Sequence, residues 1–441
     1  MVVSGGATDP GFDSGRGPAL ARGSGTLSRL RPGHRAAIES SPFNAPLSGR
    51  GAERSTGSQA EPVGSGAGGA GRPGVYVHVP FCGSICHYCD FNRVLGDDLD
   101  LMGRYADGLV REVERTFGAR EDWPTFGSLF IGGGTPTLLH SEQLRSLVSA
   151  IVHSGRLGEG AEVTVEANPE TVTVAYMDAL AEAGVNRVSM GAQSFSPHVL
   201  EFLGRRHTAD KPLEAVAAVR AAGIPRVSLD LIYGAPGETD EDWKHSLRTA
   251  VDAGLDHISA YALTVEANTP YAAMVKADPP LAPDEDVQAE RMETAARILG
   301  AAGLDRYEVS NWARPGHESR HNLVYWRGGD WLGIGAGAHG HWQGRRTWQV
   351  RSPQRWVEHV EAGEEPLGGE EILTAEQRRE ERLLMGLRIR EGVRRDEVEP
   401  IDEQAAAAMA AQGLITDDGE RIRVTDAGRA LTGAIVLRLL P

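Results

Sequence analysis

Cysteine and lysine are both scarce in this sequence of 441 residues. Only three lysines accompany 42 arginines, a ratio that we attribute to genomic base composition and not to function. The three cysteines, Cys82, Cys86 and Cys89, lie within eight positions of one another. An odd number of cysteines at such close spacing excludes a disulfide framework, which a chain of this length does not need. They predict a metal site in a protein of the reducing cytoplasm.

Long apolar runs and a positive net charge are also lacking. No apolar run reaches the ~20 residues that a membrane-spanning helix needs, which argues against an integral membrane protein. The first residues show no basic start followed by an apolar core, so a secretory signal is not expected. A net charge of −16 makes general nucleic-acid binding a poor hypothesis. At ~100–200 residues per domain, the length predicts two or three domains.

Residues 1–72 are rich in glycine, serine and proline, which together fill 32 of the 72 positions. The only aromatic residues in this stretch are Phe12 and Phe43. Such a composition cannot bury enough apolar surface to offset the entropy lost on ordering, so the sequence predicts a disordered tail. The tail is either a targeting or regulatory segment or a dispensable extension.

From Val75 onward, short apolar runs alternate with longer helical patterns. The predicted strands are Val75–Phe81, Ser128–Gly133, Glu162–Ala167, Arg187–Gln193, Arg226–Ile232 and His257–Thr264. The predicted helices are Leu101–Phe117, Ser141–His153, Ala175–Ala183, Pro212–Ala222 and Glu241–Ala253. This alternation predicts an α/β fold over residues 73–305 with a parallel sheet, open or rolled into a barrel. In both forms, ligands gather at the C-terminal ends of the strands.

The pattern changes after about residue 305. Residues 306–373 form a predicted covering segment, in which His317–Trp348, rich in Gly, His and Trp, is expected to be irregular. Residues 374–441 are predicted to form a small α+β domain. Its expected order is two helices (Glu376–Arg390 and Asp402–Gln412), a strand at Arg421–Val424 and a last helix from Asp426, which resembles a winged helix. DNA binding is not expected, because the unit is acidic and has no arginine cluster on its second helix.

The three cysteines have the spacing Cys-x3-Cys-x2-Cys directly after the first predicted strand. Thiolates suit zinc and iron–sulfur clusters. A structural zinc site wants four ligands, and His78 or His87 could be the fourth. Alternatively, three thiolates on a four-iron cluster leave one iron open for an exchangeable ligand. The spacing and its place after a strand resemble the cluster loop of radical S-adenosylmethionine (SAM) proteins.

Polar residues or glycines follow the other predicted strands. The second strand ends in Gly132-Gly133-Gly134-Thr135, the third contains Glu166, and the fourth ends at Gln193. The fifth contains Asp230. Each residue alone could merely cap a strand end. Their common position indicates a binding rim, because the carboxyl ends of parallel strands share one edge.

With these motifs, the sequence resembles the oxygen-independent coproporphyrinogen III oxidase family of radical SAM proteins over residues 75–440. Within it, the chain is similar to the HemW heme chaperone branch. The oxidase branch continues its motif to a fourth cysteine, where this chain has Phe91 in Cys89-Asp90-Phe91-Asn92. The segment His321-Asn322-Leu323-Val324-Tyr325-Trp326 also resembles the chaperone branch.

The resemblance implies a partial (β/α)6 radical SAM barrel with a 4Fe–4S cluster and SAM. It assigns the cluster to Cys82, Cys86 and Cys89. The implied SAM-binding residues are Tyr76, Tyr88, Gly133, Gly134, Thr135, Glu166, Gln193, Arg205, Asp230 and Ala262. Glutamate and aspartate can accept hydrogen bonds from the ammonium or hydroxyls of SAM, and an arginine can hold its carboxylate by two parallel bonds.

The implied function is a heme chaperone that transfers heme to acceptor hemoproteins, respiratory ones among them. The alternatives are the oxidase, which decarboxylates two propionates of coproporphyrinogen III, and a radical SAM enzyme with another substrate. His321, with His339 and His341 behind it, is the candidate heme ligand; alternatively, His321 only bonds the barrel rim. A homodimer and a transient membrane contact are both compatible with the resemblance, which names neither the acceptor nor any catalytic residue.

Overall fold

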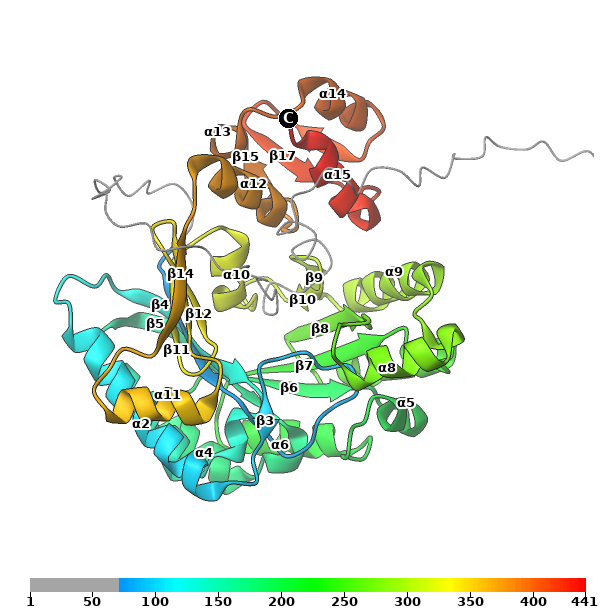
Figure 1. Cartoon of the computed structure of the whole chain (residues 1–441). Coiled ribbons are helices and arrows are strands. Elements are labelled where there is room, and N and C mark those ends of the chain that lie inside the picture. The colour runs from blue at the N-terminus through cyan, green and yellow to red at the C-terminus, as the bar shows by residue number, and fades with distance from the viewer. Residues whose placement is uncertain (1–70) are drawn as a thin grey trace, which may run out of the picture. The chain divides into compact units, whose positions relative to one another are not determined.

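The computed structural model describes residues 71–441, and its centre is a parallel α/β barrel (Figure 1). Six parallel strands lie side by side in chain order. They are β1 (Gly74–Val79), β4 (Phe126–Gly133), β5 (Leu157–Ala167), β6 (Arg187–Gln193), β7 (Arg226–Tyr233) and β8 (His257–Ala262). The predicted partial (β/α)6 barrel is confirmed, and Arg187–Gln193 is a strand over the predicted range.

Helices connect these strands and cover the outer face of the sheet. They are α2 (Leu99–Gly118), α3 (Ser141–Val152), α4 (Val174–Glu182), α5 (Pro197–Phe202), α6 (Lys211–Ala221), α7 (Asp240–Asp252), α8 (Pro270–Ala277) and α9 (Glu285–Ala301). The short 3-10 helices η2 (Pro136–Leu138), η3 (Pro169–Thr171) and η4 (Pro279–Leu281) lie in the loops. The five predicted helices differ from the observed bounds by at most two residues at either end.

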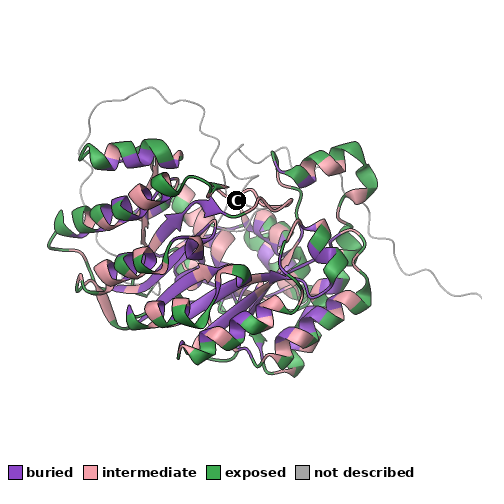
Figure 2. Cartoon of the chain, turned by 90° about the horizontal axis from the view of Figure 1, so that it is seen from below, coloured by how far each residue is buried: buried purple, intermediate pink, exposed green. Residues whose placement is uncertain are grey.

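The main core lies between the strands and the covering helices, where Figure 2 shows buried strands and helices exposed only on their outer faces. In β1, Val75, Val77 and Val79 are fully buried in this core. Tyr76 and His78 point to the opposite face, because successive side chains of a strand alternate. The inner face of the barrel is therefore available for polar side chains.

The sheet extends beyond the six predicted strands on both sides. On one side, β11 (Trp331–Ile334) pairs parallel with β1, and β12 (His339–Trp342), β13 (Arg345–Gln349) and β14 (Leu367–Ile372) follow antiparallel. On the other, β10 (Asn311–Ala313) and β9 (Asp305–Arg306) continue from β8. The predicted covering segment, residues 306–373, also contains α10 (Arg320–Trp326) and α11 (Pro353–Glu361). The prediction of irregular structure for His317–Trp348 is therefore wrong, because strands this short show no clear alternation of apolar residues.

The C-terminal elements form a second, smaller core around Leu383, Val393 and Ile422. They are α12 (Ala375–Gly386), β15 (Val393–Arg394), α13 (Arg395–Val398), α14 (Glu403–Ala411), β16 (Ile415–Asp417), β17 (Arg421–Val424), η5 (Arg429–Leu431) and α15 (Thr432–Leu439). The three strands form one antiparallel sheet in the order β15-β17-β16. This arrangement confirms the predicted winged-helix-like unit. Its last helix begins later than expected, at Thr432 after a 3-10 turn.

Two further predictions concern the N-terminal tail and membrane-spanning helices. The predicted disordered tail over residues 1–72 falls almost entirely outside the described residues. Within residues 71–441, no helix has both the length and the apolar character needed to cross a membrane. The predicted boundaries at residues 72, 305 and 373 stay predictions.

Candidate functional site

The cysteine loop follows β1 at the C-terminal end of the barrel strands, which we call the cysteine rim. Cys82 ends the two-residue strand β2 (Phe81–Cys82), which pairs with β3 (Val94–Leu95). Cys86 and Cys89 lie in the loop between these strands. The loop is closed by the Gly96 N–H, which donates to the Cys82 carbonyl at 2.9 Å. All three thiols are therefore carried by one short closed segment.

The chemistry around the thiols fits an iron–sulfur cluster. The Arg205 Nη1 donates to Cys86 Sγ at 3.4 Å, and the Arg93 guanidinium donates to the Cys89 carbonyl. Burial raises the pKa of the Cys89 thiol to about 12, so a bare thiolate is disfavoured there. Bound iron and the two guanidiniums would offset that cost, because they supply positive charge beside the sulfurs.

No metal centre is assembled in the described residues as they stand. Among residues 71–441, no three side chains of His, Cys, Asp or Glu converge on one metal position. The zinc alternative is weakened at one of its two candidate fourth ligands, His78. The two ring nitrogens of His78 lie 2.8 Å from the Tyr76 hydroxyl and from the Asn92 carbonyl, so neither is free for a metal. Cluster ligation by Cys82, Cys86 and Cys89 stays a prediction, which the donor types favour.

The glycine run after β4 lies against the cysteine loop. The Gly134 N–H donates to the Val79 carbonyl at 2.8 Å, and the Thr135 N–H donates to the Phe81 carbonyl at 2.7 Å. A Cβ atom at Gly134 would lie 2.6 Å from the Phe81 carbonyl oxygen. Only glycine permits this approach, so the run holds the start of the cysteine loop in place. The Thr135 hydroxyl also donates to Cys82 Sγ at 3.9 Å.

Two predicted carboxylates, Glu166 and Asp230, lie inside the barrel. Glu166 accepts the Gly133 N–H at 3.0 Å, and Asp230 accepts the Ser189 hydroxyl at 3.3 Å. Burial, together with the charge of the nearby Asp230, raises the pKa of Glu166 to about 8, although the hydrogen bond from the Gly133 N–H acts to lower it. Burial also raises the pKa of Asp230. Both groups would gain from a cation between them, such as the ammonium or sulfonium of SAM.

Gln193 and Arg205 meet at the end of β6. Gln193 has a φ of 64°, in the left-handed region, where the pairing of β6 with β7 shifts register. A residue other than glycine rarely adopts this conformation, and such strain is concentrated at functional sites. Arg205 donates to the Gly191 carbonyl at 2.8 Å. The strained residue and the arginine that contacts Cys86 are thereby held close together.

The remaining predicted SAM residues lie in the barrel interior, at the end of β8 and in the cysteine loop. Tyr76 lies on the inner face of β1, and Ala262 is the last residue of β8. Tyr88 packs against the apolar cluster of Val199, Leu203 and Tyr271. The role of each in SAM binding stays a prediction.

Sequence reasoning missed Asn92 and Arg93, which fasten the end of the cysteine loop. The Asn92 side chain donates to the carbonyls of Ala336 at 3.0 Å and Arg351 at 3.1 Å. Arg93 donates to the Phe91 carbonyl at 3.4 Å as well as to Cys89. Their partners lie on the loop itself or about 250 residues away. The sequence offers one signal for Asn92 and Arg93, which is their position just after Cys89, the last cysteine.

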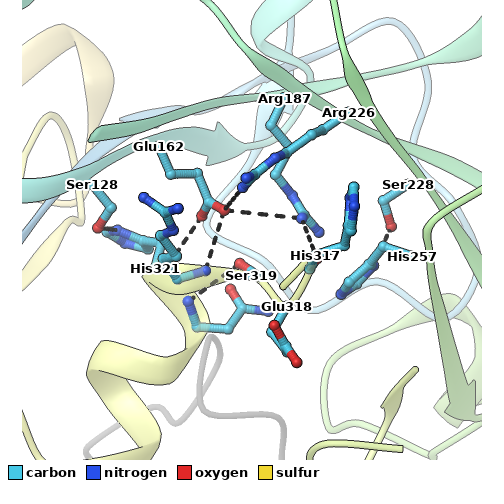
Figure 3. A network of polar contacts seen from close by, with 12 residues as sticks. Ser128, Glu162, Arg187, Arg226, Ser228, His257, His317, Glu318, Ser319 and His321 are labelled. Atoms are coloured by element: carbon cyan, nitrogen blue, oxygen red, sulfur yellow. Dashed lines mark hydrogen bonds and ion pairs between the residues drawn. The ribbon is translucent and has the colours of Figure 1, made fainter. Parts of the chain in front are cut away.

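His321, the predicted heme ligand, lies beside Ser128 near the N-terminal end of β4 (Figure 3), whereas the cysteine loop follows the C-terminal end of β1. His321 belongs to α10 and is fully buried. Its Nδ1 lies 2.8 Å from the Ser128 hydroxyl, and its Nε2 lies 2.8 Å from the Tyr325 hydroxyl. Both ring nitrogens are therefore occupied. This geometry favours the alternative, in which His321 bonds the barrel rim, over heme ligation.

Glu162 holds α10 in this place. Its carboxylate accepts the N–H groups of Arg320 at 3.2 Å and His321 at 3.1 Å, at the start of the helix. It also lies 3.9 Å from Arg187 and 3.7 Å from Arg226, the first residues of β6 and β7. We call this set of contacts with α10, at the N-terminal strand ends, the closed end of the barrel (Figure 3).

The two further histidine candidates are not drawn into this network. His341 lies on β12, with its Nδ1 3.2 Å from an Asp330 carboxylate oxygen. His339 is exposed on the same strand, with its ring 6.2 Å from that of Trp348. Within residues 71–441, neither histidine contacts the cysteine loop.

The chain matches known protein families over both its barrel and its C-terminal unit. Residues 76–250 match the radical SAM superfamily, and residues 373–431 match the HemN C-terminal domain. The heme chaperone HemW of Mycobacterium tuberculosis (strain ATCC 25618 / H37Rv) is 42% identical over 373 residues, which are 84% of this chain and 95% of the relative. The chain belongs to the HemW family of radical SAM proteins. The radical SAM match itself implies a 4Fe–4S cluster and SAM.

Other relatives agree with this placement. The heme chaperone HemW of Bacillus subtilis (strain 168) is 34% identical, over 81% of this chain and 96% of the relative. The solved structure of coproporphyrinogen III oxidase (HemN) from Escherichia coli, described as a radical SAM enzyme, superposes with a TM-score of 0.72. It is 23% identical and covers 84% of this chain and 91% of that one, so it supports the fold alone.

Proposed function

We propose that this protein is a cytoplasmic heme chaperone, which binds heme and transfers it to acceptor hemoproteins while carrying a 4Fe–4S cluster and SAM. The observation that carries the proposal is 42% identity, over 84% of the chain, to a curated heme chaperone. Respiratory hemoproteins are among the acceptors compatible with the family resemblance, which names no acceptor. A homodimer and a transient contact with a membrane during transfer would be compatible with this role.

Phe91 supports the chaperone over the oxidase. It lies two residues past Cys89, where the oxidase branch has a fourth cysteine, and an aromatic ring cannot relay a proton as a thiol can. The likeness to the solved oxidase concerns the fold, and one fold serves several activities. The oxidase therefore remains the alternative that the experiment must separate.

The experiment compares heme uptake with porphyrinogen turnover in one preparation. Protein is purified, its cluster is reconstituted without oxygen, and it receives either heme or coproporphyrinogen III with SAM and a reductant. We expect about one heme per chain, transfer of that heme to an apocytochrome, and no decarboxylated porphyrinogen. Harderoporphyrinogen or protoporphyrinogen from the wild-type protein would contradict the chaperone proposal.

The variant Phe91→Cys sharpens this test. We expect it to bind heme as the wild type does and to gain no decarboxylase activity, because one thiol does not position two propionates for successive reaction. Activity in Phe91→Cys alone would show that the substrate pocket of an oxidase is still present and that the thiol was its missing part.

A further inference from the structure

A cleft opens beside the cysteine loop, between that loop and α5. Its volume is about 520 Å³, and its lining includes His87, Leu200, Gly204 and His207. A volume of this size falls within the ~300–1,000 Å³ in which proteins bind small molecules and cofactors. Pro197 and Leu200, both on α5, form an apolar wall, whereas Glu201 on the same helix, Arg205 and Thr208 add polar side chains to the lining. The cleft is distinct from the closed end, which holds His321.

His87 enters this cleft in a fixed tautomer. Its Nδ1 lies 2.7 Å from the Phe202 carbonyl oxygen, which only accepts hydrogen bonds. The neutral ring must therefore carry its proton on Nδ1, which leaves the lone pair on Nε2. Among residues 71–441, Nε2 of His87 has no hydrogen-bond partner in the structure. A histidine whose Nδ1–H bonds a backbone carbonyl is in the form that binds metal through Nε2.

The backbone of His87 is held on both sides. Its N–H donates to the Leu203 carbonyl at 3.1 Å, and its carbonyl accepts the Tyr271 N–H at 2.8 Å. These bonds tie residue 87 to the end of α5 and to α8. The imidazole is thus positioned before any ligand arrives, which lowers the cost of binding.

Gly204 makes room for the ring. It has a φ of 72°, and a Cβ atom there would lie 2.9 Å from Cδ2 and 3.0 Å from Nε2 of His87. Glycine is therefore required for both the backbone conformation and the approach to the imidazole. The backbone conformation and the close approach each require glycine at position 204, so no side chain covers this face of the His87 ring.

The other histidines near the cleft are already engaged. His207 Nε2 accepts from Arg205 Nε at 3.2 Å, and His207 Nδ1 lies 3.0 Å from the Thr208 carbonyl. His198 is about half exposed on α5, with its Nε2 3.3 Å from an Asp242 carboxylate oxygen. Of these three, His87 alone combines a fixed tautomer with a free nitrogen at the cleft.

We propose that His87 is an axial ligand of heme iron, with the heme bound in this cleft beside the cysteine loop. This inference rests on the proposed function of heme carriage. Nε2 donates its lone pair to the iron and displaces a water ligand, and no oxidation or reduction is required. The apolar wall of α5 contacts the macrocycle.

The test is a heme titration followed by absorption and electron paramagnetic resonance spectra. Cluster-loaded and cluster-free preparations of wild type, His87→Leu and His198→Leu are compared, with iron and sulfide contents measured for each. We expect His87→Leu to lose the imidazole-ligated Soret band and to bind heme at least about tenfold more weakly, as loss of a metal-site contact does. His198→Leu, on α5 but outside the residues that line the cleft, should match the wild type.

Rescue separates ligation from folding. In His87→Gly, added imidazole should restore the wild-type Soret band, which a merely structural residue would not show. Unchanged spectra and affinity in His87→Leu, or equal losses in His198→Leu, would overturn the ligand assignment while heme carriage stands. A wild-type protein that takes up no stoichiometric heme would instead overturn the proposed function, and this assignment with it.

Discussion

The two ends of the barrel contain similar polar residues in opposite situations. At the closed end, Glu162 and His321 are completely buried and each has several partners within the chain. At the cysteine rim, Glu166 and Asp230 lie on the same strands as residues of the closed end but have few partners. The difference teaches that a buried polar group with many partners in the chain stabilises the fold, whereas one with fewer partners still has the capacity to bind a ligand.

The largest effect is expected at the cysteines. Replacing Cys82, Cys86 or Cys89 singly by Ala should abolish the visible absorption of a reconstituted 4Fe–4S cluster, because the chain has no fourth cysteine to take the vacant place. Iron content and absorption spectra measure this loss. Ser84→Ala, in the same loop, is the control and should load normally. If the single variants still hold about four irons per chain, the cluster is not bound by this loop.

Glu162→Ala should lower the free energy of unfolding without changing the cysteine rim. Its removal takes away the carboxylate that lies 3.9 Å from Nη1 of Arg187, a side chain that is only 3% exposed. Breaking a buried ion pair from one side costs about 3–5 kcal/mol. Denaturant unfolding measures the change, with the exposed Glu159→Ala on the same strand as control. Equal stability of the two variants would mean that the closed end does not hold the barrel together.

His321→Leu should have a smaller effect on stability. The Ser128 hydroxyl and the Tyr325 hydroxyl each lose one hydrogen bond, so we expect a loss of about 1–3 kcal/mol in the free energy of unfolding. Heme stoichiometry and the Soret band should stay as in the wild type, and the exposed His153→Leu should change neither property. A lost Soret band in His321→Leu would restore this residue as a heme ligand.

The pKa of Glu166 should make the stability of the protein depend on pH. The Glu166 carboxyl has a pKa of about 8 in the folded protein against an ordinary 4.5, so the folded state holds the extra proton between these values. The free energy of unfolding therefore falls as pH rises through this window. Glu166→Gln removes the titration, and its stability relative to the SAM-free wild type should grow from pH 5 to pH 8. A difference that is constant with pH would show that Glu166 ionises normally, as the exposed Glu182→Gln control should.

Sequence alone predicts the barrel well, because each strand and helix carries a local signal. The cysteine loop was equally accessible, since all three thiols fall within eight positions. The closed end was not, because the contact between Glu162 and His321 joins residues 159 positions apart. His321 was singled out for its chemistry, and only the packing of α10 reveals that both nitrogens are occupied. His87 was considered only for zinc, because its tautomer depends on the Phe202 carbonyl, 115 residues away.

At Gln193, the stability of the fold and the predicted binding of SAM make opposite demands on the residue. Its left-handed backbone, at φ 64°, costs about 1–3 kcal/mol in a residue other than glycine. Glycine at this position would remove the strain and also the carboxamide that the predicted SAM contact requires. A library of variants selected for heat resistance alone should therefore enrich glycine at position 193 and discard SAM affinity in the same step. Selection for thermal stability would work against the binding rim at this one position.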